Sequence, residues 1–182
     1  YEHIVFDGKH HHSLLSHNEL WERTLVISSF GKTLNATGWK LGYCTAPAAL
    51  SAEFRKVHQF NVFSVSSPMQ YGLADFLLSE PEFCDQVPAF YEQKRDHFCR
   101  LLEGSRLRLE PARSTFFQIV DYGDITDEDD LSLAKRWTRE IGVASIPLSV
   151  FCETPYTGTR LRFCFAKDDA TLEEAARRLC DL

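Results

Sequence analysis

Residues able to carry out chemistry gather in one stretch of the sequence, 26–46, which holds two lysines and a pair of serines. Lys32 comes after a β-branched apolar run and Gly31, and Lys40 stands eight residues later, at the start of a second run. An unprotonated lysine amine attacks a carbonyl carbon, while a second cation and a serine hydroxyl can hold an anion nearby. The stretch therefore indicates a site that combines a reactive amine with anion binding where strands end.

Two other interpretations fit parts of this stretch. The tripeptide Gly31-Lys32-Thr33 matches the end of a phosphate-binding nucleotide loop, but that motif needs a glycine where Val26 stands. Lysine is rarely buried, so a pair of solvated lysines at strand ends also agrees with the pattern. The nucleotide loop is disfavoured because its first glycine lets the backbone wrap the phosphates.

A longer motif favours the reactive site. Residues 28–33 (SSFGKT) and 37–43 (TGWKLGY) resemble the cofactor-lysine segment of fold type I pyridoxal-phosphate aminotransferases. Within that family the branch of methionine, kynurenine and glutamine aminotransferases is most similar, and the bacterial methionine aminotransferases most of all. The resemblance extends over nearly the whole chain, and its further specific points are 55–59, 90–96, 146–149 and 162–167.

The resemblance implies pyridoxal 5'-phosphate as cofactor and assigns residues to it. Lys32 is implied as the lysine that binds the cofactor covalently, and Ser29 and Lys40 as the residues that hold its phosphate. Tyr1 is implied to hydrogen-bond the phenolic oxygen of the cofactor. The family also has an aspartate three residues before that tyrosine, a position that precedes residue 1 here.

Substrate residues are implied in the same way. Arg162 matches the arginine that grips the substrate carboxylate, for which a planar guanidinium is suited because it donates two parallel charge-assisted bonds. Arg160 lies two residues before it, on the same face of the expected strand, and without the motif both would be taken as surface arginines. Phe63 is a candidate substrate contact across a dimer, with a core aromatic as the alternative. Ser114 stands where the family has a glycine, so the backbone turn and the close ligand approach of the family are not implied at this position.

The implied reaction is transfer of an amino group from an amino acid to a 2-oxo acid. The cofactor acts as electron sink, and Lys32 moves the proton at the substrate α-carbon. A carbon–sulfur β-lyase shares the first half-reaction and remains an alternative, and a non-catalytic fragment is an alternative of another class. The preference for a methionine, aromatic or glutamine type of side chain follows from the resemblance alone, as does a homodimer.

Length indicates a part of a larger protein. The chain has 182 residues and no initiator methionine, its first residue already lies inside the family motif, and related enzymes are roughly twice as long. We expect an α/β fold in the form of the C-terminal part of an aminotransferase, inactive by itself. Residues 1–47 would be the remainder of the large cofactor-binding domain, 48–89 interdomain helices and 90–182 a small α+β domain.

Composition excludes several classes of function. Hydrophobic residues make up 44% and charged residues 25%, which is typical of soluble globular proteins, and no apolar run reaches the length of a membrane span. A net charge of −6 without a basic cluster argues against a nucleic-acid partner. The six cysteines are too scattered for metal-ligand spacing and indicate reduced core thiols of a cytoplasmic protein.

No metal site is predicted from the histidines or the acidic run. The three consecutive histidines 10–12 favour a surface loop, because neighbouring side chains on an extended chain point in opposite directions. The acidic run 124–130 favours a solvated loop and a helix start, because it lacks the central glycine and closing glutamate of a calcium loop.

Hydrophobic periodicity predicts the elements that position these residues. Strands are expected at 1–6, 24–28, 39–45, 107–109, 116–122, 143–146 and 161–165, and helices at 48–60, 68–78, 82–103, 131–141 and 171–179. Ser67 and Thr171 are the expected N-caps of two helices. The second half predicts a sheet with helices on one side. Lys32 would follow the carboxyl end of a buried strand, where ligands bind in open α/β sheets.

Overall fold

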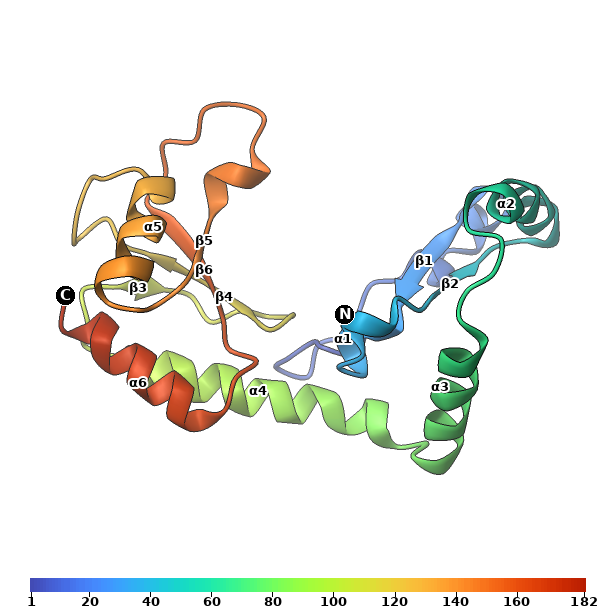
Figure 1. Cartoon of the computed structure of the whole chain (residues 1–182), viewed down its shortest axis with the longest axis horizontal. Coiled ribbons are helices and arrows are strands. Elements are labelled where there is room, and N and C mark those ends of the chain that lie inside the picture. Colours follow the sequence, from blue (N-terminus) through green and yellow to red (C-terminus); the bar gives the residue numbers. More distant parts are fainter. The chain divides into compact units, whose positions relative to one another are not determined.

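Two small antiparallel sheets organise the chain, one in each of its two units. The computed structural model describes residues 1–182, which divide into Tyr1–Pro88 and Ala89–Leu182. The first unit holds the strand pair β1-β2, and the second holds a four-stranded sheet in the order β3-β4-β6-β5 (Figure 1). Mixed α and β elements agree with the predicted α/β class.

The elements have the following bounds. The strands are β1 (Val26–Ser29), β2 (Gly42–Thr45), β3 (Arg108–Leu109), β4 (Phe117–Asp121), β5 (Ile146–Pro147) and β6 (Arg160–Cys164). The α-helices are α1 (Phe30–Thr33), α2 (Ala48–Asn61), α3 (Ser67–Ser79), α4 (Phe83–Leu101), α5 (Asp130–Glu140) and α6 (Asp169–Cys180). Short 3-10 helices are η1 (Leu14–Ser16), η2 (Asn18–Arg23), η3 (Thr37–Trp39) and η4 (Leu148–Phe151).

The β1-β2 hairpin is the framework of the first unit. The strands pair in antiparallel register from Val26 opposite Thr45 to Ser29 opposite Gly42. The β-branched and aromatic residues of 26–29 and 42–45 favour such a pleated pair. The predicted strand over 39–45 is shorter than expected, because the 3-10 helix η3 uses its first residue. Lys32 follows the carboxyl end of β1, as predicted.

The first six residues do not form the strand that their β-prone sequence predicts. Ile4 donates its backbone N–H to the carbonyl of Tyr1, at 2.8 Å, and Lys9 donates to Phe6 at 3.1 Å. These local turn bonds use groups that a strand ladder would need. Ile4 and Phe6 are nevertheless 0% exposed, so burial of their side chains holds the segment in place.

Helix α2 forms where its periodicity predicts, but none of its residues is buried. Its large apolar side chains Phe54, Val57 and Phe60 are all exposed. An amphipathic helix normally buries its apolar stripe. Most of the apolar stripe of α2 is therefore exposed, while Leu50 and His58 are half-buried.

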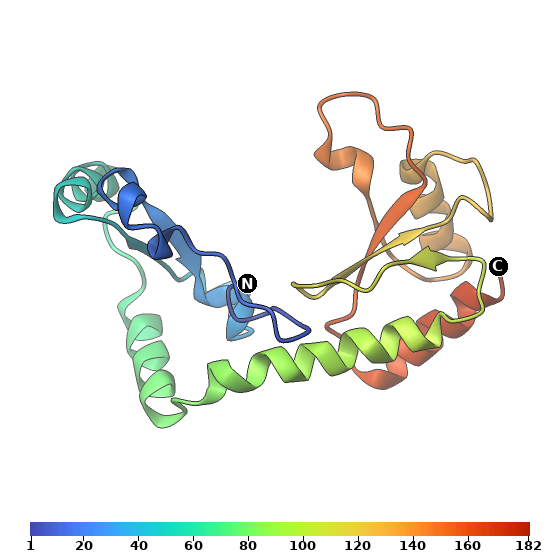
Figure 2. The ribbon, with the colours of Figure 1, turned by 180° about the vertical axis from the view of Figure 1, so that it is seen from behind.

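The sheet of the second unit buries one of its faces. Gln118 and Val120 of β4 and Leu161 and Phe163 of β6 alternate with exposed or half-buried neighbours. Phe163 packs on Phe98 of α4, with ring centroids 6.3 Å apart. On the same face, Tyr122 lies beside Trp137 of α5, at 6.2 Å, and α6 lies alongside α4 (Figures 1 and 2). The predicted sheet with helices on one side is confirmed.

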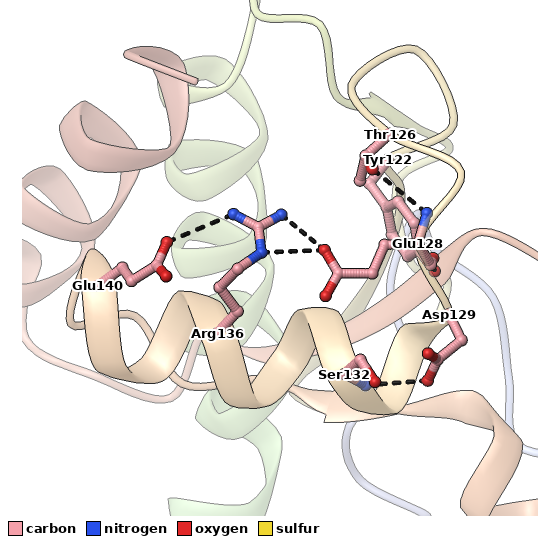
Figure 3. Close-up of polar contacts among 7 residues, drawn as sticks. All are labelled: Tyr122, Thr126, Glu128, Asp129, Ser132, Arg136 and Glu140. Carbon is pink, nitrogen blue, oxygen red and sulfur yellow. Dashed lines mark hydrogen bonds and ion pairs between the residues drawn. The ribbon is translucent and has the colours of Figure 1, made fainter.

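The acidic run forms a loop and the start of α5, as predicted. Asp129 is the N-cap, and its carboxylate accepts a hydrogen bond from the backbone N–H of Ser132 at 2.9 Å (Figure 3). Arg136 then bridges the carboxylates of Glu128 and Glu140, at 2.8 and 3.4 Å. The negative charges are thus used to cap the helix and to pair with one arginine.

Several element boundaries differ from prediction for local reasons. The predicted N-cap Thr171 lies inside α6, because Asp168 caps that helix by accepting from the Thr171 N–H at 2.7 Å. Ser67 is already helical, and Ser66 precedes it without a side-chain cap. The strand expected over 143–146 is reduced to β5, because Gly142 (φ 70°) ends α5 and the Val143 N–H returns to that helix, donating to the Trp137 carbonyl.

The cysteines are not the core thiols that the sequence predicts. All six are free thiols, and none is fully buried: Cys152 and Cys180 are exposed and the other four are half-buried. Burial raises the pKa of the Cys99 thiol to about 11, with a smaller opposing effect of Arg95.

No helix of the chain has the length and apolar character needed to cross a membrane.

Candidate functional site

Ser29, Gly31 and Lys32 share one turn at the end of β1. Ser29 is the last residue of the strand and the N-cap of α1, where its Oγ accepts a hydrogen bond from the Gly31 N–H at 3.1 Å. This cap turns the chain so that Lys32 lies in α1, half-buried, three residues past the serine. The serine and lysine predicted to act together thus lie on one turn of backbone.

Lys40 returns to this turn through its neighbour Leu41. The Leu41 carbonyl accepts from the Ser29 hydroxyl at 3.4 Å and from the Phe30 N–H at 3.2 Å. Lys40 itself is exposed and adopts the left-handed conformation, φ 57° and ψ 37°, at the end of η3. The structure therefore brings the segments of Ser29 and Lys40 together, as the spacing predicts.

Two glycines allow this close approach of backbone segments. A Cβ at Gly31 would lie 3.0 Å from the Cα of Thr37, and a Cβ at Gly42 would lie 2.7 Å from the carbonyl oxygen of Ser28. The Thr37 hydroxyl also donates to the Gly31 carbonyl at 2.8 Å. Glycine at both positions lets the return segment pack directly on the turn that carries Lys32.

The polar groups of this turn fit a phosphorylated carbonyl compound. Neither Lys32 nor Lys40 forms an ion pair, so both side chains are available to bind an anion or, when unprotonated, to react. Thr33 is 4% exposed, and its hydroxyl has no hydrogen-bond partner. Buried hydroxyls are usually hydrogen-bonded, so an unsatisfied one next to Lys32 in α1 is consistent with a polar ligand. The site thus offers an amine, an anion-binding cation and hydroxyl donors.

Tyr1 and Glu2 stand at the side of the hairpin. Tyr1 is half-buried, and its carbonyl accepts from Ile4. The carboxylate of Glu2 accepts hydrogen bonds from the Ser28 hydroxyl at 2.6 Å and from the Tyr43 hydroxyl at 2.9 Å. Burial acts to raise the pKa of Glu2, but these bonds outweigh it and lower the pKa to about 2. The sequence analysis did not predict a role for Glu2. The one feature that could have indicated it is a charged residue within the β-prone segment 1–6.

Arg162 occupies the open face of the sheet in the second unit. Its guanidinium lies over the ring of Phe117, at 4.0 Å from the centroid, and 5.0 Å from that of Phe151. Its Nε atom is buried without a hydrogen-bond partner, and the side chain has no ion pair. Two aromatic faces hold the guanidinium through cation–π contacts and leave its donors to a carboxylate. Arg160 shares the face but is exposed.

The sequence left the burial of Phe63 and the backbone turn at Ser114 undecided. Phe63 is 83% exposed with φ 64°, so the alternative of a core aromatic is wrong for this chain. At the turn before β4, the left-handed residue is Thr115 (φ 66°) and not Ser114. The glycine-to-serine replacement therefore does not fall on the residue with positive φ, and the turn tolerates it.

Metal-binding side chains do not gather anywhere in the chain. No group of three or more histidine, cysteine, aspartate or glutamate side chains is placed to hold a metal ion. The histidines 10–12 lie exposed in the segment before η1.

Comparison with known proteins defines the class. The family model described as aminotransferase class I and II matches residues 1–179. The chain therefore belongs to the class I and II aminotransferase family, which confirms the resemblance seen in the motifs. It is 50% identical over 182 residues to methionine aminotransferase of Escherichia coli (strain K12), covering 100% of this chain and 47% of that protein. It is 33% identical over 200 residues to kynurenine–oxoglutarate transaminase 1 of Rattus norvegicus, covering 98% and 47%.

Solved structures agree with this assignment. The crystal structure of YbdL from Escherichia coli, described as having a methionine aminotransferase function, is similar with a TM-score of 0.95 at 50% identity. The match covers 100% of this chain and 48% of that one. N-succinyldiaminopimelate aminotransferase from Mycobacterium tuberculosis gives 0.92 at 32% identity, covering 100% and 47%. The predicted aminotransferase fold is confirmed, and the chain spans about half the length of the curated relatives it matches.

Proposed function

We propose that the protein carrying this chain is a pyridoxal-phosphate-dependent aminotransferase that transfers an amino group from an amino acid to a 2-oxo acid. The observation that carries the proposal is the turn on which Ser29, Lys32 and the return segment of Lys40 meet, with both lysines free of ion pairs. Family membership supports it. The carbon–sulfur lyase has no observation in its favour beyond the shared first half-reaction.

Lys32 is the proposed covalent attachment point and proton carrier. Pyridoxal 5'-phosphate, when bound, supplies the electron sink for the substrate's α-carbon. The Lys32 Nζ atom would accept and return the proton of the substrate's α-carbon. The Ser29 hydroxyl and the Lys40 side chain would hold the phosphate, and the Tyr1 hydroxyl would donate to the phenolic oxygen.

Arg162 is the proposed binding site of the substrate α-carboxylate. The rings of Phe117 and Phe151 restrict its guanidinium, so less conformational freedom is lost when a carboxylate binds. For the side chain of the amino acid we propose methionine first and aromatic residues or glutamine second. This order follows the named function of the relative that is 50% identical.

A homodimer is proposed from the uncovered apolar surface of the first unit. The exposed side chains Phe54, Val57 and Phe60 of α2 and the exposed Phe63 after it form a set that a folded protein normally covers. We propose that Phe63 contacts substrate at the neighbouring subunit's site.

A cytoplasmic location is proposed as well, from the six free thiols. The division into a large-domain remainder at 1–47, linking helices at 48–89 and a small domain at 90–182 also remains a proposal.

One assay separates the proposed reaction from its alternative. The full protein is incubated with pyridoxal 5'-phosphate, a 2-oxo acid and either methionine, phenylalanine or glutamine, and the new amino acid is quantified. An aminotransferase forms the amino acid of the supplied 2-oxo acid in amounts equal to the donor consumed. Pyruvate and ammonia released from cystathionine, with no transferred amine, would favour the lyase and contradict the proposal.

A further inference from the structure

Glu2 connects the start of the chain to the hairpin that carries the site. One of its carboxylate oxygens, Oε1, accepts from both the Ser28 hydroxyl and the Tyr43 hydroxyl, at 2.6 and 2.9 Å. Ser28 and Tyr43 are direct partners in the β1-β2 ladder. A single oxygen therefore joins both strands at the same pair, beside the strand end from which Ser29 and Lys32 follow.

The surroundings of Glu2 restrict its carboxylate further. The Glu2 side chain is only 24% exposed. The two neutral hydroxyls of Ser28 and Tyr43 hydrogen-bond the carboxylate. The nearby Cys84 thiol has its pKa raised, first by burial and then by the charges of Asp85 and Glu2. Such an arrangement holds a charged group in one place rather than leaving it in solvent.

We propose that Glu2 is a positioning residue: its carboxylate, held by the Ser28 and Tyr43 hydroxyls, fixes the backbone next to Tyr1 on the β1-β2 hairpin and so sets the Tyr1 hydroxyl relative to Lys32. The inference rests on the proposed function, because Tyr1 and Lys32 are the residues assigned to the cofactor there. Tyr1 is the neighbouring residue in the chain, and its carbonyl is already held by the N–H of the fully buried Ile4. Glu2 lies between these two residues and is bound to the hairpin. Removing its carboxylate takes away this anchor next to Tyr1 while the hydrogen bonds of the turn at Ser29 and Lys32 remain.

The experiment measures binding of pyridoxal 5'-phosphate to the full apoprotein by absorbance and fluorescence titration. Glu2→Ala and Glu2→Gln are compared with wild type, and Glu53→Gln on α2 serves as the control, since Glu53 is exposed and pairs only with Lys56. We expect Glu2→Ala to weaken binding by roughly tenfold or more, as loss of partners supporting metal-ligand side chains does. Glu2→Gln, which keeps the size and one acceptor, weakens it less, and the control leaves it unchanged.

A double-mutant cycle with Tyr1→Phe distinguishes positioning from general damage. If Glu2 acts through Tyr1, then Glu2→Ala weakens binding much less in the Tyr1→Phe background than in wild type. The pH midpoint of the visible absorbance of the bound cofactor also shifts in the same direction in Tyr1→Phe and in Glu2→Gln. An equal loss in both backgrounds would overturn the proposal, and so would wild-type binding in Glu2→Ala.

Two further variants keep the test decisive if Glu2→Ala fails to fold. Ser28→Ala and Tyr43→Phe each remove one donor to Glu2 while leaving its charge in place. Both are expected to weaken cofactor binding and to couple to Tyr1→Phe, and additive effects would overturn the proposal. If the wild-type protein itself binds no pyridoxal 5'-phosphate, the proposed function fails and this inference fails with it. If wild type binds the cofactor and the variants bind equally well, only the role of Glu2 fails.

Discussion

Replacing Gly42 with alanine tests whether close packing of β1 on β2 builds the site. The added Cβ would lie 2.7 Å from the backbone carbonyl oxygen of Ser28, and the next neighbours are 3.8 Å away. A carbon and a carbonyl oxygen approach comfortably to about 3.3–3.6 Å, so the strands must separate by roughly 0.6–0.9 Å. A backbone oxygen of a paired strand cannot rotate away as a flexible side chain does.

The size of the effect follows from two opposing terms. Overfilling a packed position costs about 1–3 kcal/mol. Alanine restricts the unfolded chain more than glycine does, and this effect stabilises the folded state by about 0.4–1 kcal/mol. The net expectation is a loss of about 1–2 kcal/mol in the free energy of unfolding of the first unit. Weaker binding of pyridoxal 5'-phosphate should accompany it, because Gly42 is the ladder partner of Ser29.

Denaturant unfolding of the full apoprotein, followed by circular dichroism and by cofactor titration, measures both effects. Gly38→Ala is the matched control, because a Cβ there meets nothing within 4 Å. The control should be neutral or slightly stabilising and should keep the affinity for cofactor. Equal stabilities and affinities for the two variants would refute the reasoning, since they differ only in the space available to the new methyl group.

Three other substitutions have defined outcomes. Arg162→Ala should raise KM for amino acids by the equivalent of about 2–3 kcal/mol with cofactor affinity retained, whereas Arg160→Ala should leave KM unchanged. If steady-state kinetics show the raised KM in Arg160→Ala and not in Arg162→Ala, the carboxylate binds at Arg160 instead. Trp137→Ala should lower the stability of the second unit by roughly 3–5 kcal/mol in denaturant unfolding, because the side chain is 1% exposed; a loss below about 1 kcal/mol would contradict its place in the core. The hydrogen bond from Arg177 is the largest of the effects that lower the pKa of Glu174 from 4.5 to about 2, so the stabilisation by this carboxylate is present above pH 4.5 and lost as the pH falls toward 2. Glu174→Gln should remove that part of the acid dependence of the unfolding midpoint, and an unchanged acid profile would contradict the assignment.

Local sequence patterns predicted much of the fold because they depend on neighbouring residues. The helices α2 to α6 and the strands of the second sheet follow from periodicity, and their ends are within a few residues of prediction. The segment 1–6 was mispredicted because its β-prone residues close local turns that interrupt a strand, although Ile4 and Phe6 are buried. The cap of α6 was misplaced because Asp168 and Thr171 both suit an N-cap, and in the structure the Asp168 carboxylate accepts from the Thr171 N–H.

The candidate site was predictable only in its local part. Ser29, Lys32 and Lys40 could be grouped from one continuous motif with fixed spacing. Glu2 could not, since its contact with Ser28 spans 26 residues and depends on the register of the hairpin. Phe151 likewise reaches the Arg162 guanidinium from η4, which no sequence pattern near β6 reports. Contacts between distant segments are set by packing, and single-sequence periodicity does not carry that information.

Attachment of the cofactor to Lys32 is the central claim, and mass spectrometry tests it most directly. The full protein is loaded with pyridoxal 5'-phosphate, the bond to the lysine is reduced with borohydride, and the digested peptides are sequenced. The expected result is a pyridoxyl-phosphate group on Lys32, absent from Lys32→Ala and retained in Lys56→Ala, whose lysine is exposed and paired with Glu53. A label on Lys40 instead, or a visible cofactor band that persists unchanged in Lys32→Ala, would contradict the account.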